Sequence, residues 1–167
     1  VLDTDEIDAP AEAPPPVEKQ LRGPDRQWYG MTVFPWENLT LGLGWLYDVP
    51  SGHMSVELLH SYDGIDWRRE GPRRPWVADD CPSGLSSHMY VTASNPPHVL
   101  DKEMWFYVSG ANRNHHQVSS ATPSQMRLLS MPLNRWVSYG THGEHPGLLL
   151  SAPLAWRGGR LALNAAI

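Results

Sequence analysis

The sequence has little that would cross-link it, attract nucleic acid or carry it through a membrane. Only one of its 167 residues is a cysteine, Cys81, so no internal disulfide can form. Lys and Arg number 13 against 18 Asp and Glu, and the net charge of −5 argues against the clustered basic surface that nucleic acid requires. No apolar run reaches the length of a membrane span. We therefore expect neither nucleic acid nor a membrane as a partner.

Aromatic residues and short strand-like runs are what the sequence does contain. Eight tryptophans and six tyrosines accompany runs rich in strand formers, which are separated by glycine and proline turns. These patterns predict an all-β chain with almost no helix. The predicted strands are 27–34, 39–47, 54–61, 67–70, 87–93, 103–110, 125–131 and 135–140, with a final pair at 147–151 and 160–166.

The clearest local signal is the hairpin Leu58 to Trp67. Asp63-Gly64 supplies the turn backbone, and the side chains of Ser61 and Asp63 are expected to hydrogen-bond the amides of that turn. Trp67 can then fold its indole across the hairpin and bury apolar area. A structural role in the turn explains Asp63 better than a catalytic one.

This pattern recurs in weaker form. The run Leu41–Tyr47 is followed about 60 residues later by Glu103–Ser109, and Leu58-Leu59 is followed about 70 residues later by Leu128-Leu129. Four strand-like runs per repeat are typical of a β-propeller blade. The alternative is chance similarity between hairpins of an all-β sandwich.

The repeats divide the chain into three parts. Residues 1–26 form an acidic and proline-rich irregular lead-in, and residues 27–140 form two blades, at 27–70 and 87–140. Residues 141–167 are expected to begin a C-terminal β-sandwich. Two blades do not close a propeller, so we expect the chain to be a piece of a longer protein whose remaining blades are its partners.

Five segments carry a family resemblance: Leu58–Arg69, Met104–Tyr107, Trp136–Ser138, Gly147–Leu149 and Gly159–Ala165. In order and spacing they resemble a family of bacterial five-bladed propeller proteins described as glycoside-hydrolase-like, related in architecture to glycoside hydrolase families 32 and 43. The resemblance implies the last blades of a partial propeller and the first strands of a β-sandwich. It also implies a carbohydrate ligand and pocket carboxylates on earlier blades. Ser86 stands where such relatives carry a pocket aspartate.

The candidate ligand residues combine rings with amide and imidazole groups, a mixture that suits a polar ligand. They are Trp28, Tyr29, His88, Tyr90, Asn112 and His115. No pair of carboxylates can be named as catalytic, and Glu57 is placed in mid-strand, facing either a pocket or solvent. Adjacent His115 and His116 point opposite ways along an extended chain, so we predict no metal and no cofactor.

Three functions remain open. The first is a glycoside hydrolase relative that acts on a glycan. The second is a non-catalytic glycan-binding or scaffold propeller that has lost its acid and base, which the apparent loss at Ser86 favours. The third is a metal-dependent lyase or hydrolase, and it depends only on the histidine loop.

Overall fold

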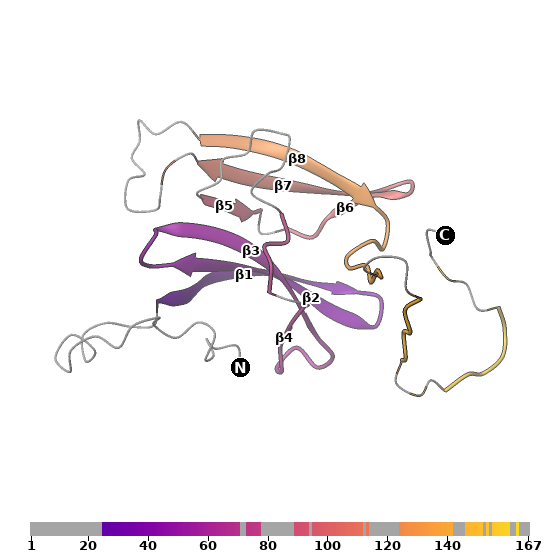
Figure 1. The fold of residues 1–167 in the computed structure, drawn as a ribbon. Coiled ribbons are helices and arrows are strands. Elements are labelled where there is room, and N and C mark those ends of the chain that lie inside the picture. Colours follow the sequence, from indigo (N-terminus) through magenta and orange to yellow (C-terminus); the bar gives the residue numbers. More distant parts are fainter. Residues whose placement is uncertain are drawn as a thin grey trace, which may run out of the picture. The chain divides into compact units, whose positions relative to one another are not determined.

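The computed structural model describes residues 25–70, 73–77, 89–93, 95–111, 113, 124–141, 146–151, 153, 155–160 and 163. These residues contain eight β-strands and no α-helix, which confirms the all-β prediction (Figure 1). The described part of the chain has no helix long and apolar enough to cross a membrane. The strands are β1 (Arg26–Trp36), β2 (Leu39–Asp48), β3 (His53–Ser61), β4 (Arg68–Arg69), β5 (Met89–Thr92), β6 (His98–Leu100), β7 (Glu103–Ala111) and β8 (Ser124–Pro132).

The first four strands form an antiparallel meander, which we call the first meander. Strand β1 pairs with β2, β2 with β3, and β3 with β4. The β1–β2 connection is a two-residue turn in which Glu37 has a φ of 53°. Gly52 has a φ of 68° in the β2–β3 turn, a backbone conformation that glycine adopts without strain. The four strands predicted over residues 27–70 are therefore confirmed.

The remaining strands form the second meander, with β7 at its centre. Strand β8 pairs along the whole of β7, whereas β5 and β6 share the opposite edge of β7. Thr92 pairs with Val108 and His98 with Trp105, so β5 and β6 are two parts of one interrupted edge. The sequence prediction missed β6 because Pro96-Pro97 immediately before it is typical of a loop.

The predicted strands after β8 are wrong where the structure describes them. Residues 135–141 and 146–151 contain no strand, so 135–140 does not supply a fourth strand to the second meander. Leu148, Leu149 and Leu150 are largely exposed, and no strand among the described residues pairs with them. Most of 160–166 lies outside the described residues. The chain divides into two compact units after Asn134, and residues 141–167, for which we predicted the start of a β-sandwich, lie in the second.

Apolar side chains connect the two meanders. Met104, Phe106 and Val108 alternate along β7 and are buried, as are Leu43 and Val56 of the first meander. Trp76 packs its ring edge-on against Phe106 at a centroid distance of 4.9 Å, and its amide donates to the Val56 carbonyl at 2.6 Å. A single parallel pairing, between Met54 and Met89, joins the two meanders into one open sheet.

A buried polar chain also joins the meanders. The Trp45 Nε1–H donates to Thr92 Oγ1 at 3.1 Å, and Thr92 Oγ1 lies 3.2 Å from Thr32 Oγ1. Thr32 in turn donates to the Ala93 carbonyl at 3.0 Å. Since both threonines are buried, each hydroxyl needs such partners, and the chain fixes where β5 lies against β1 and β2.

Candidate functional site

One end of the open sheet gathers the ends of six strands. Asp48 pairs with Arg26 on one side and with His53 on the other. Beside His53, Met54 pairs with Met89, which also pairs with Ala111. The row across this end of the sheet is Arg26, Asp48, His53, Met89, Ala111 and Ser124.

The candidate ligand residues that the structure describes lie near this end. Trp28 and Tyr29 lie near the start of β1, and Tyr90 is the second residue of β5. His88 directly precedes Met89 in the chain and Asn112 directly follows Ala111. His88, Asn112 and His115 themselves lie outside the described residues, as does the side chain of Tyr90.

Tyr29 occupies a β-bulge. The register of β1 against β2 shifts between Trp28 and Gly30, which leaves Tyr29 as an extra residue. Its ring stands 5.0 Å from the ring of Tyr47 at an angle of 56°, while 49% of Tyr29 remains exposed. Burial, and then repulsion from Tyr29 and Asp48, raises the pKa of Tyr47. Tyr29 is therefore a half-exposed ring held against a neutral tyrosine.

Trp28 lies on the opposite side of the sheet from Tyr29. The Arg69 guanidinium lies over the Trp28 ring, 5.2 Å from its centroid, as in a cation–π contact. A Cβ atom at Gly44 would come within 2.6 Å of Trp28 Cζ3, so the indole lies directly on the backbone of β2. Its Nε1 atom is buried without a hydrogen-bond partner. Trp28 and Tyr29 consequently do not form one stacking platform.

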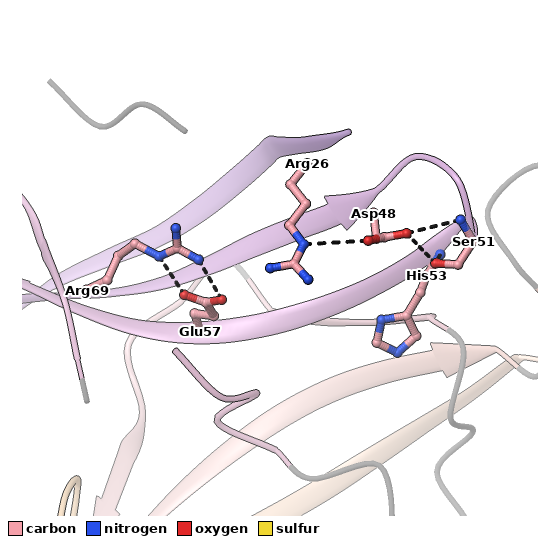
Figure 2. Close-up of polar contacts among 6 residues, drawn as sticks. All are labelled: Arg26, Asp48, Ser51, His53, Glu57 and Arg69. Atoms are coloured by element: carbon pink, nitrogen blue, oxygen red, sulfur yellow. Dashed lines mark hydrogen bonds and ion pairs between the residues drawn. The ribbon is translucent and has the colours of Figure 1, made fainter. Parts of the chain in front are cut away.

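Glu57 forms a buried ion pair that the sequence did not predict (Figure 2). Arg69 Nε donates to Glu57 Oε2 and the terminal Nη2 donates to Oε1, both at 2.8 Å. The side chains of Arg69 and Glu57 are only 6% and 5% exposed. The bidentate geometry occupies both carboxylate oxygens, so Glu57 has a structural role in joining β3 to β4. Only the register of β3 against β4 reveals this partner.

Asp48 is held at the row of strand ends (Figure 2). Its Oδ1 accepts the Ser51 amide at 3.0 Å and the Ser51 hydroxyl at 2.6 Å, and Oδ2 lies 3.5 Å from Arg26 Nε. Burial alone would raise the pKa of Asp48, but the Ser51 hydrogen bonds and the Arg26 charge lower it overall. The carboxylate stays ionised and secures the β2–β3 turn.

The Asp63 turn is built as the sequence predicted. Asp63 Oδ1 accepts the amides of Ile65 and Asp66 at 2.8 Å and the Ser61 hydroxyl at 3.0 Å. Ser61 Oγ also accepts the Gly64 amide at 2.9 Å. The hydrogen bonds from Asp66, Ile65 and Ser61 lower the pKa of Asp63. The side chain is committed to the turn and is not available as a catalytic acid.

These hydrogen bonds make the turn sensitive to acid. Because the folded pKa of Asp63 lies below the unfolded value of about 3.9, its contribution is present above about pH 4 and is lost as the pH falls through the folded pKa. Asp63→Asn is expected to flatten the dependence of unfolding free energy on pH below about pH 4. Denaturant unfolding of the full-length protein at several pH values measures this. Equal slopes for wild type and variant would contradict it.

Two further described carboxylates have partners of their own. Glu70 pairs with His60, and Glu37 accepts from Asn134 Nδ2 at 3.2 Å. The described residues also contain no cluster of three or more His, Cys, Asp or Glu side chains that could hold a metal. The predicted histidine loop at 115–116 lies outside them. No family model, curated protein sequence or solved structure matches the chain.

Proposed function

We propose that this chain is part of a carbohydrate-active β-propeller protein related to glycoside hydrolases. In this proposal the described residues supply blade framework and ligand contacts, and the acid–base pair of a hydrolase lies elsewhere in the protein. The observation that carries the proposal is the half-exposed ring of Tyr29, which lies near the row of strand ends that Met89 of β5 and Ala111 of β7 also reach.

The first meander supports the propeller part of the proposal. It consists of four antiparallel strands, the number in one propeller blade. Its β3–β4 turn has the Ser-x-Asp-Gly-x-x-Trp pattern from Ser61 to Trp67. The second meander packs apolar residues of β7 toward the first, as successive blades do.

The ring of Tyr29 supports a carbohydrate ligand. A half-exposed aromatic ring on a fixed backbone can stack on the apolar face of a sugar, and the bulge and Tyr47 hold this ring in place. It lies at the end of the sheet where β5 begins and β7 ends. Binding residues tend to lie on such loops of a rigid scaffold.

The state of the carboxylates favours binding as the second candidate function. Hydrolysis needs two carboxyl groups about 5 to 10 Å apart, one of them able to donate a proton. Glu57 is occupied by Arg69, and Asp63 is occupied by its own turn. A non-catalytic glycan-binding or scaffold propeller therefore needs no further carboxylates, whereas a hydrolase needs them from other blades.

Tyr29→Ala in the full-length protein tests the ligand site. Loss of one stacking ring is expected to weaken glycan binding about tenfold, which corresponds to about 1.4 kcal/mol. A glycan array identifies the ligand and calorimetry measures its affinity. Tyr62→Ala is the matched control, because Tyr62 is 73% exposed and lies at the β3–β4 turn, away from the row of strand ends. Equal affinities for the two variants would contradict the proposed site.

Release of reducing ends separates the two candidate functions. A hydrolase relative is expected to cleave the glycan that the array identifies, and a binding protein is expected to leave it intact. Catalytic turnover that survives removal of every carboxylate outside residues 25–134 would contradict our placement of the acid–base pair.

A further inference from the structure

The β1–β2 turn carries a modification motif that the proposed function does not use. Asn38-Leu39-Thr40 has the pattern Asn-x-Ser/Thr, with a residue other than proline in the middle, which marks acceptor sites for N-linked glycosylation. The pattern occurs once in the 167 residues. A three-residue pattern also arises by chance, so the asparagine side chain must be accessible and unoccupied before it counts as a site.

The structure meets both conditions at Asn38. Asn38 is exposed and is the second of the two turn residues, and no hydrogen bond involves its side-chain amide within the described part of the chain. The other asparagines there have engaged amides, because Asn95 Nδ2 donates to the Pro96 carbonyl at 2.9 Å and Asn134 Nδ2 donates to Glu37 Oε1 at 3.2 Å. Asn38 is thus the described asparagine whose side-chain nitrogen is free to react.

Neighbouring residues, and not the side chain of Asn38, hold the turn. The Trp36 Nε1–H donates to Asn134 Oδ1 at 2.9 Å, and the amide of Asn134 in turn reaches Glu37. Trp36 also pairs with Leu39 across the two strands. Glu37 has a left-handed φ of 53°, a conformation that costs a non-glycine residue energy and that these contacts maintain. A sugar joined to Asn38 therefore displaces no contact that fixes the turn.

The turn lies at the opposite end of β1 from the row of strand ends. Arg26, in that row, and Trp36, at the turn, are the first and last residues of the strand. At about 3.3 Å per residue they are about 30 Å apart. A glycan at Asn38 consequently leaves Tyr29 and the rest of the row accessible.

We propose that Asn38 carries an N-linked glycan, transferred from a sugar donor that is activated as a diphosphate. Asn38 Nδ2 forms a bond to C1 of the donor sugar, and the bond from C1 to the diphosphate oxygen breaks. The diphosphate leaves with the electron pair, and the amide gives one proton to a base of the transferase. In this motif the Thr40 hydroxyl is the group that the transferase requires. Lipid-linked oligosaccharides and nucleotide sugars are the two donor classes with this chemistry.

Mass spectrometry of peptides from the full-length protein, purified from its native source, tests the site. We expect the peptide that contains Asn38 to be heavier by whole sugar residues. The sugar attached to Asn38 is an N-acetylhexosamine if the donor is a lipid-linked oligosaccharide and a hexose if it is a nucleotide sugar. Asn95 is the internal control, because it is exposed but is followed by two prolines, and it should be unmodified. An unmodified Asn38, or equal modification of Asn95, would overturn the proposal.

Two variants at position 40 test the motif. Thr40→Val keeps the shape and strand preference of the side chain but removes the hydroxyl, so the glycan should be lost although Asn38 is intact. Thr40→Ser is the matched control, because it keeps a hydroxyl and should keep the glycan. A glycan that persists in Thr40→Val would overturn the assignment. Since the readout is the mass of the protein itself, failure of glycan binding at Tyr29 does not imitate failure of this site.

Discussion

Arg69→Met is expected to lower the free energy of unfolding by about 3–5 kcal/mol, because it leaves the Glu57 carboxylate buried without its partner. The variant also removes the cation from the Trp28 ring. Denaturant unfolding of the full-length protein measures the loss. Arg68→Met is the matched control, since Arg68 is the exposed neighbour on β4 and should change stability by less than about 0.5 kcal/mol. Equal effects of the two variants would contradict the buried pair.

The double variant Glu57→Leu with Arg69→Met separates pairing from burial. With both charges gone, no ion remains to be desolvated, and we expect the double variant to recover much of the stability lost in Arg69→Met. Strictly additive losses would show that packing of the two side chains, and not their charges, matters. Trp28→Ala is expected to be destabilising for a related reason, because its ring covers both Arg69 and Gly44.

Trp67→Ala is expected to cost about 3 kcal/mol, the lower end of the range for large aromatic deletions, because the ring is only partly buried. The ring lies on β2, where a Cβ at Gly42 would come within 2.9 Å of Trp67 Cζ3. Thermal unfolding and glycan affinity should be measured together. A thermally silent Trp67→Ala that abolishes binding would assign this ring to a ligand site instead.

Gly42→Ala provides the reciprocal test of that contact. The added methyl would meet Trp67 and also Met31 Sδ at 2.6 Å, so the variant is expected to be destabilising. The penalty should be smaller in the Trp67→Ala background, where one of the two obstacles is absent. Gly140→Ala is the control, since a Cβ there meets nothing within 4 Å.

Local signals explain what the sequence could predict. The β3–β4 turn depends on side chains within six residues of one another, so Ser61, Asp63 and Trp67 could be assigned correctly from their spacing. The first meander followed from runs of strand-forming residues separated by turn residues. The match between Trp45 and Trp105 was also visible, because β2 and β7 share the Trp-x-Tyr pattern.

Non-local contacts explain what the sequence could not predict. The partner of Glu57 depends on the register of β3 with β4, and no pattern within either strand encodes that register. The Leu-Leu repeat has the same limit, because Leu58 pairs with Leu43 whereas Leu128 pairs with Tyr107. The two hairpins correspond as elements, but their cross-strand partners do not correspond residue by residue.

The contacts between the meanders have a consequence for the order of folding. Strands β1, β2 and β3 are joined by short turns, so their hairpins close small loops quickly. The Thr32–Thr92 hydrogen bond joins residues 60 apart, and it can form only after a much larger loop has closed. On the ribosome, the first meander is complete before β5 has been synthesised. Its apolar side, which includes Leu43 and Val56, is then exposed to chaperones and to other nascent chains until Thr92 emerges.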